Sequence, residues 1–144
     1  MYCPNHRSVL NIIQLVGMKW RTGTHSIDHT SKVTTTPDKF RVGEEWRKFE
    51  VVRDASLHTL YGCNCFAYAL VASGFGVDAV VETELGIYNY AAIVPVFQGA
   101  GGVITDWNGS ALTLQNHDDC KGRVVAYSNT ALYSEMLCTV GTRN

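Results

Sequence analysis

From residue 64 onward, apolar segments alternate with glycine-containing breaks, and this alternation restricts the fold more than any other feature of the chain. Residues 64–73 are almost entirely apolar and small, and Gly74 and Gly76 follow them, which predicts a buried helix with a glycine C-cap. Strands are predicted at 77–83, 103–107, 111–114 and 124–128, and helices at 89–98 and 130–137. Asn89 would be an N-cap and Pro95 a kink. Alternating helices and strands predict a layered α/β fold.

The amino-terminal part follows a different pattern. Residues 9–20 are rich in Val, Ile and Leu and predict a strand, residues 21–32 a turn-rich connection, and residues 33–36 a short β-branched run. Residues 43–53 predict an exposed helix with an i,i+4 pair of Glu44 and Lys48. A strand so near the start has few residues before it with which to pair. We therefore expect a truncated chain, in which the neighbours of this strand are missing or come from another chain.

The composition predicts a globular protein with few surface charges. Of the 144 residues, 46% are hydrophobic and 17% are charged, below the roughly 25% charged residues of typical soluble domains. This favours a partner, or a missing piece of the same protein, over part of the surface. Twelve basic and thirteen acidic residues give a net charge of -1, which argues against nucleic acid or a membrane as partner, because both select a basic excess.

The lack of a recognisable secretory signal and the pattern of the cysteines predict a location inside the cell. No apolar run reaches the ~18 residues of a membrane span, and the start of the chain shows no secretory signal. The five cysteines are odd in number and irregularly spaced, which argues against a disulfide framework and predicts an intracellular, reducing compartment.

Two patterns resemble ligand sites but have structural explanations. Residues 99–102 read Gly-Ala-Gly-Gly, yet a phosphate loop follows a strand and opens a helix, whereas these glycines follow a helix and precede a strand. We expect a helix C-cap and a tight crossover there. Cys63 and Cys65 form a C-x-C pair without the second pair or the histidines of a zinc site. They are predicted as small, buried packing residues at a helix start.

Carboxylates stand at the ends of two predicted strands. Glu82 and Glu84 close the strand at 77–83. A carboxylate just beyond a strand end, facing a helix start, is placed to bind a substrate or a metal ion, and the alternative is a solvated charge at the strand tip. Asp106 ends the next predicted strand and is expected to cap a turn.

Residues 86–109, which read GIYNYAAIVPVFQGAGGVITDWNG, resemble the carboxy-terminal signature of the inositol monophosphatase superfamily. In that family an acidic residue after an aromatic residue opens a helix, and the helix ends in Gly-Gly before a strand and an Asp. Tyr88, Pro95 and the Asp106-Trp107 pair make this variant most similar to the histidinol-phosphate phosphatase branch, including its plant members. Residues 61–70 (YGCNCFAYAL) and 34–40 (TTTPDKF) agree, so the resemblance runs from about residue 9 to residue 128.

The resemblance implies the carboxy-terminal half of the layered inositol-monophosphatase fold: an α/β unit with a mixed sheet flanked by helices, preceded by a remnant of the amino-terminal antiparallel sheet. Residues 1–36 would be the remnant and its connection, and residues 37–144 the α/β unit. Family members hydrolyse phosphate monoesters with two or three Mg²⁺ ions. Most of the metal-binding carboxylates lie upstream, in a Glu and an Asp-Pro-x-Asp-Gly-Thr motif that this chain lacks. Asp28 only superficially resembles the end of that motif and is not expected to bind metal.

Three site positions follow from the resemblance. Glu82 matches the family's substrate-contacting Glu and would accept a hydrogen bond from a substrate hydroxyl or amine. Asn89 stands where the family has a metal-binding Asp, and Asn64 stands at the rim of the substrate pocket where the family also has an Asp. An amide offers a neutral oxygen but not the charge that Mg²⁺ prefers. We therefore expect Mg²⁺ as the cofactor, bound weakly, and no catalytic residue in this chain.

The expected function is a Mg²⁺-dependent phosphate monoester hydrolase of the histidinol-phosphate or inositol-monophosphate type. Its substrate would be a small phosphomonoester, and the chain alone would turn it over slowly or not at all. The alternative is a degenerate, non-catalytic paralogue that acts as an interaction module through an exposed sheet edge. A homodimer is a family-based expectation, and because the plant relatives are plastid proteins, the expected compartment is the cytoplasm or a plastid.

Overall fold

The computed structural model describes residues 32–35, 43–62 and 64–130, and for residues 32–35 and Asn64 it describes the backbone alone. The strand predicted at 9–20, the connection that follows it, and all but the first residue of the helix predicted at 130–137 lie outside the described residues. Cys63 and Asp28 also lie outside them.

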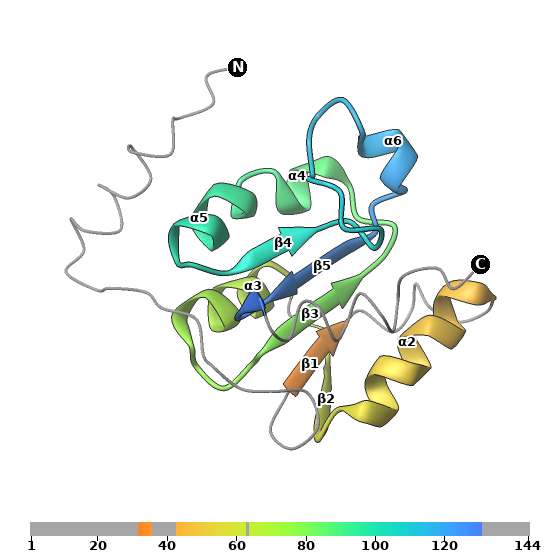
Figure 1. The fold of residues 1–144 in the computed structure, drawn as a ribbon, viewed down its shortest axis with the longest axis vertical. Coiled ribbons are helices and arrows are strands. Elements are labelled where there is room, and N and C mark those ends of the chain that lie inside the picture. Colours follow the sequence, from red (N-terminus) through yellow and green to blue (C-terminus); the bar gives the residue numbers. More distant parts are fainter. Residues whose placement is uncertain (1–31, 36–42, 63, 131–144) are drawn as a thin grey trace.

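Five short strands form one mixed sheet (Figure 1). The strands are β1 (Lys32–Thr35), β2 (His58–Tyr61), β3 (Ala79–Glu82), β4 (Val103–Thr105) and β5 (Val124–Tyr127). Their order is β2-β1-β3-β5-β4. β1 runs parallel to β2 and β3, and β5 runs antiparallel to β3 and β4. The predicted α/β fold with a mixed sheet is confirmed. β1 joins strands of the predicted 37–144 unit, and the boundary between residues 36 and 37 stays a prediction.

Helices cover both faces of this sheet (Figure 1). They are α2 (Glu44–Ala55), α3 (Asn64–Ser73), α4 (Ile87–Tyr90), α5 (Ile93–Gly99) and α6 (His117–Cys120). Buried side chains of α3, α4 and α5 pack in one apolar cluster, and those of α2 pack in another. We call the two sides of the sheet the α3 face and the α2 face.

Alternation along the central strands assigns their side chains to these two faces. Val80 of β3 joins the α3-face cluster with Val124 and Ala126 of β5. The residues between them point the other way: Ala79, Val81, Val125 and Tyr127 pack on the α2 face against Phe49 and Val52 of α2. All of these side chains are fully buried. The predicted helix at 43–53 is thus confirmed, although it is exposed on one side only.

The helix predicted at 89–98 is wrong in one respect, because the chain forms two helices there. Asn89 lies inside α4 and donates its backbone N–H to the Gly86 carbonyl (2.9 Å), so Gly86 and not Asn89 is the N-cap. Pro95 is the third residue of α5. The first backbone N–H groups of a helix have no partner within it, so Pro95 removes no hydrogen bond and makes no kink.

The glycines after α5 close the helix as predicted. Gly101 has φ of 88°, and Gly102 donates its N–H to the Phe97 carbonyl (3.1 Å). A Cβ on Gly102 would stand 2.4 Å from the Phe97 ring, so only glycine allows this close crossover into β4.

The strand predicted at 111–114 does not form. The side chain of Asn116 instead accepts the Thr113 N–H (2.8 Å) and donates to the Ala111 carbonyl (2.6 Å), which folds this segment into a loop. Asp106 caps the turn before it as predicted, because its Oδ1 accepts the N–H groups of Asn108 (2.8 Å) and Ser110 (2.7 Å).

Candidate functional site

Glu82 is the last residue of β3, and its side chain is fully buried with 0% exposure. It lies two residues after Val80, so its carboxylate points to the α3 face. A carboxylate is rarely buried so completely unless hydrogen-bond donors or a counter-charge surround it. Complete burial excludes the alternative prediction for Glu82, a solvated charge at the strand tip. Glu84 is exposed and fits that description instead.

Tyr68 of α3 lies within electrostatic range of this carboxylate. Its side chain is 1% exposed, and within the described part of the chain its hydroxyl has no hydrogen-bond partner. Burial raises the pKa of Tyr68 well above the usual value for a tyrosine, and electrostatic interactions with Glu82 and Cys65 add to the effect. The phenol therefore stays neutral and keeps its hydroxyl proton.

The start of α3 also contacts α4. The Cys65 thiol lies 3.8 Å from the backbone carbonyl oxygen of Asn89. Cys65 is exposed, so the prediction that it is a buried packing residue is wrong. It occupies the first turn of α3, on the side that faces α4 and not the core. Asn64 is the residue before it and begins the helix.

The structure thus brings the predicted site positions to one region of the α3 face. Glu82 and Cys65 both act electrostatically on the Tyr68 hydroxyl, and the Cys65 thiol joins the first turn of α3 to the Asn89 carbonyl. Asn89 is partly exposed. Two exposed aromatic residues flank the contact: Phe66 follows Cys65 and is 62% exposed, and Tyr88 precedes Asn89 and is 81% exposed.

The donors of this region do not fit a complete magnesium site. Across residues 43–62 and 65–130, no three His, Cys, Asp or Glu side chains converge in a way that could hold a metal ion. Glu82 is the one carboxylate among the three predicted positions, and Asn64 and Asn89 carry neutral amides. Mg²⁺ prefers several oxygen ligands in octahedral geometry, with carboxylates among them. The described residues would leave most of that geometry and charge unsupplied.

The chain that follows Glu82 is held tightly. Glu84 adopts φ of 55° and donates its N–H to the Lys121 carbonyl (3.2 Å), and Leu85 donates to the Gly122 carbonyl (3.1 Å). A Cβ on Gly122 would stand 2.3 Å from backbone atoms of Leu85, so this approach requires glycine. The connection from β3 to α4, which separates Glu82 from Asn89, is therefore fixed against the loop before β5.

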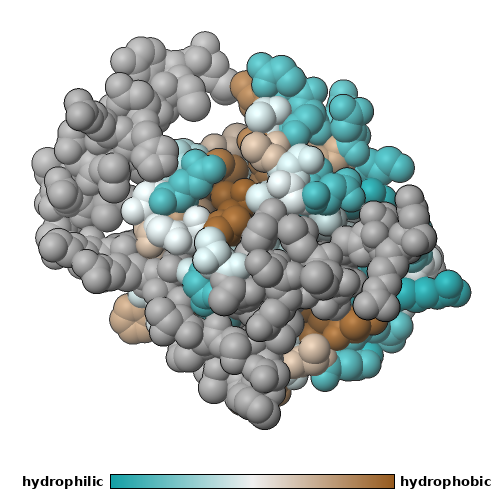
Figure 2. Space-filling model, in the orientation of Figure 1, coloured by the Kyte–Doolittle hydropathy of each residue, from teal (hydrophilic) through white to brown (hydrophobic). Residues whose placement is uncertain are grey.

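α4 is also tied to α6. The Tyr90 hydroxyl lies 2.7 Å from Nδ1 of His117, and the two rings are tilted at 41°. Burial raises the pKa of Tyr90 to about 12, and the Cys120 thiol and the Asp118 carboxylate add to the shift. In the view of Figure 2, hydrophilic side chains gather over the α6 region at the upper right.

A second polar cluster lies on the α2 face, behind Glu82. Thr83 points to this side and donates its hydroxyl to Oε2 of Glu45 (3.1 Å). Arg123 donates from Nε to Oε1 of the same carboxylate (2.6 Å), and its Nη2 contacts that oxygen as well. Trp107 donates its indole N–H to the backbone carbonyl of Glu82 (3.1 Å). No sequence pattern predicts this cluster, since Glu45 and Arg123 are 78 residues apart.

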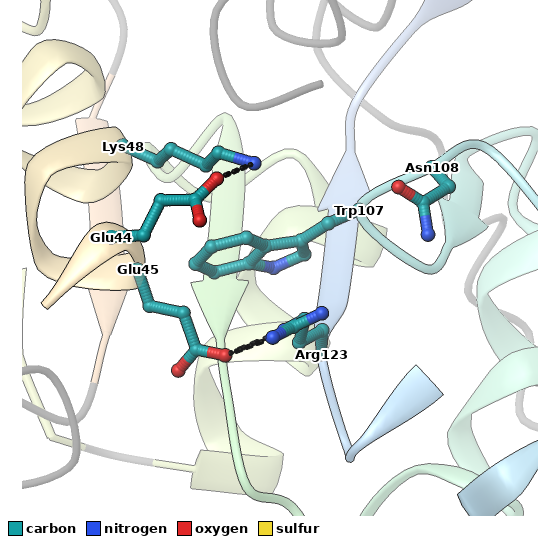
Figure 3. Close-up of a pocket in the computed structure, with 6 residues that line it drawn as sticks. All are labelled: Glu44, Glu45, Lys48, Trp107, Asn108 and Arg123. Carbon is teal, nitrogen blue, oxygen red and sulfur yellow. Dashed lines mark hydrogen bonds and ion pairs between the residues drawn. The ribbon is translucent and has the colours of Figure 1, made fainter. Parts of the chain in front are cut away.

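A pocket of about 220 Å³ opens over this cluster. Its lining residues are Glu44, Glu45, Lys48, Trp107, Asn108 and Arg123. Figure 3 shows the indole of Trp107 lying between the Glu44–Lys48 pair and the Glu45–Arg123 pair. Both oxygens of Glu45 accept hydrogen bonds from protein groups, so the charges that line the pocket mostly satisfy one another.

The family model described as the inositol monophosphatase family matches residues 8–141. The chain belongs to this family. Its sequence is also 53% identical, over 76 residues, to the bifunctional phosphatase IMPL2, chloroplastic, of Arabidopsis thaliana, a match that covers 53% of this chain and 21% of that protein. The resemblance predicted from residues 86–109 is therefore confirmed for the family, and the plant relative agrees with the predicted plant-like branch.

Solved structures of the family share the fold. The chain is 30% identical to an inositol monophosphatase from Zymomonas mobilis, with a TM-score of 0.75 over 85% of this chain and 47% of that one. The suhB extragenic suppressor protein of Bartonella henselae is 20% identical, with a TM-score of 0.72 over 87% of this chain and 47% of that one. The chain thus spans about half the length of these solved structures, and its match to the plant relative covers about a fifth of that protein. Each described helix is too short or too polar to cross a bilayer.

Proposed function

We propose that this chain carries the substrate-orienting part of a phosphomonoester hydrolase of the inositol monophosphatase family. The observation that carries the proposal is the fully buried Glu82 carboxylate at the end of β3, on the face of the sheet that α3, α4 and α5 cover. The substrate would be a small phosphomonoester, either histidinol phosphate or an inositol monophosphate.

Glu82 would accept a hydrogen bond from a hydroxyl or an ammonium group of the leaving alcohol. A carboxylate withdrawn from water attracts a hydrogen-bond donor more strongly than an exposed one does. Tyr68 supports this role, since its buried hydroxyl lies within electrostatic range of Glu82 and has no hydrogen-bond partner among the described residues. The interaction orients the substrate and does not itself cleave the phosphate ester.

The family's metal chemistry would depend on groups beyond the described residues. Family members use Mg²⁺ to polarise the phosphate and to activate water. Asn89 and Asn64 occupy positions where the resemblance leads us to expect carboxylates, so Glu82 is the one acid among the three predicted site positions. We therefore expect weak Mg²⁺ binding and little or no turnover by this chain alone. A homodimer and a location in the cytoplasm or a plastid remain part of the proposal.

Binding of phosphomonoesters tests this role of Glu82. We expect the chain, with Mg²⁺ present, to bind histidinol phosphate or inositol monophosphate measurably in a calorimetric titration. Glu82→Gln should weaken binding at least tenfold, because the amide replaces an acceptor charge in a buried site. Glu84→Gln is the matched control, since Glu84 is exposed and two residues away, and it should stay within twofold of the native chain. Equal binding by the Glu82→Gln variant, or no binding by any of the three proteins, contradicts the proposal.

A further inference from the structure

We infer that Glu45 and Arg123, which lie on the α2 face, are positioning residues for the Glu82 carboxylate on the opposite face of the sheet. The inference rests on the proposed role of Glu82 in orienting a phosphomonoester. Glu45 and Arg123 act on Glu82 through the backbone of β3 and contact no substrate themselves.

The polar cluster on the α2 face contacts the end of β3. Trp107 donates its indole N–H to the carbonyl of Glu82 itself, and Thr83 donates its hydroxyl to Glu45. Glu82 and Thr83 are both fully buried. The last residue of β3 and the residue after it are thus held by side chains from the turn after β4 and from α2.

Arg123 holds the Glu45 carboxylate in place. Its Nε and Nη2 contact Oε1 of Glu45, while the Thr83 hydroxyl donates to Oε2. Arg123 immediately precedes Val124, and Val124 is the register partner of Glu82 in the antiparallel ladder. Arg123 therefore anchors Glu45 from the position just before the strand that pairs with Glu82. Glu45 of α2, the residue after β3 and the residue before β5 meet in one network of charge-assisted hydrogen bonds.

The contacts on the α2 face also restrict the orientation of Glu82 on the α3 face. Successive side chains of a strand project from one backbone to opposite faces, so a rotation of the strand end that releases Thr83 also turns Glu82. A carboxylate that orients a substrate must be held within about 0.5 Å of its productive position. The network on the α2 face restricts that rotation without adding any group to the substrate side.

The neighbouring ion pair offers a matched control. Glu44 precedes Glu45 on α2 and pairs with Lys48 across the same pocket (3.1 Å). Its side chain is largely exposed, and its pKa is lowered by the Lys48 partner. Its carboxylate contacts Lys48, whereas the contact with Thr83 is made by Glu45, so neutralising Glu44 changes the charge of the pocket without releasing the strand end.

The experiment compares Thr83→Val and Glu45→Gln with two controls, Glu44→Gln and Val52→Ala. Val52 lies in the α2-face core, so its truncation lowers stability without touching the network. Nuclear magnetic resonance follows the indole N–H of Trp107 and the backbone N–H groups of Glu82 and Thr83, and a titration with histidinol phosphate gives the affinity.

We expect Thr83→Val and Glu45→Gln to shift these three signals and to weaken binding of the probe at least fivefold, while both controls stay within twofold. The inference is overturned if the two network variants leave the signals in place, or if they weaken binding no more than Val52→Ala does. If the native chain does not bind the probe, the proposed function fails by itself. The signals then decide the inference alone: shifts confined to the network variants support it, and their absence overturns it.

Discussion

The two faces of the sheet are held together by different means. On the α3 face, buried side chains from α3, α4, α5 and α6 pack together, and Glu82, Tyr68 and Asn89 lie on this same side of the sheet. On the α2 face, a smaller apolar cluster is joined by the network of Glu45 and Arg123. Apolar packing supplies most of the stability of a domain, whereas directional polar contacts fix a particular position. The α3 face therefore carries the candidate site, and the α2 face fixes the strand that presents it.

The largest expected effect tests the apolar side of this comparison. Phe97→Ala removes a fully buried ring from the α3-face cluster and should lower the free energy of unfolding by about 3–5 kcal/mol. The loss should change little with salt, since no charge is removed. Urea denaturation followed by circular dichroism gives the value.

Phe75→Ala provides the control for Phe97, because the same side chain is 71% exposed there. Its effect should stay within about 0.5 kcal/mol. A loss below about 1 kcal/mol for Phe97→Ala would break the comparison, since the α3-face cluster would then not be the principal core.

A smaller effect concerns the polar contact at the rim of the α3 face. Burial raises the pKa of Tyr90 to about 12, from about 10 in the unfolded chain. Below pH 10 both states hold the proton, so this group contributes no pH dependence. Between pH 10 and pH 12 the unfolded chain loses the proton first, and the free energy of unfolding should fall by about 1.4 kcal/mol per pH unit.

Denaturation curves at pH 9, 10, 11 and 12 measure this fall. Tyr90→Phe should lose clearly less stability than the native chain over the same interval. Tyr88→Phe is the matched control, because Tyr88 is 81% exposed, and it should follow the native curve. Identical curves for all three proteins would show that Tyr90 ionises as readily in the folded state as in the unfolded one.

Part of this organisation is predictable from the sequence, because the signals are local. The apolar run at 64–73 predicts α3, and the β-branched residues before Glu82 predict β3 and the carboxylate at its end. The resemblance adds Asn64 and Asn89 through one continuous signature. The four-residue segments of β2 and α6 escape prediction, since four residues are too few to show a period.

The α2-face network escapes prediction for a different reason. In the sequence, Glu45 is one of several charged residues in the helix predicted at 43–53, and Arg123 is a charged residue just before the strand predicted at 124–128. Only the folded chain brings them together with Thr83, and no local pattern encodes a contact across 78 residues. Asn89 shows the same limit on a smaller scale: its residue type predicts an N-cap, but the packing of α4 places it within the helix.

We propose that a substrate-orienting Glu82 coexists with amides at the positions where a magnesium ion would need carboxylates. Release of phosphate from histidinol phosphate in the presence of Mg²⁺, measured for the native chain and for an Asn64→Asp, Asn89→Asp double variant, tests it most directly. We expect little or no phosphate release by the native chain and at least tenfold faster release by the double variant. Chelation of Mg²⁺, or the further change Glu82→Gln, should abolish this gain. Rapid, chelator-sensitive release by the native chain, no faster in the double variant, would contradict it.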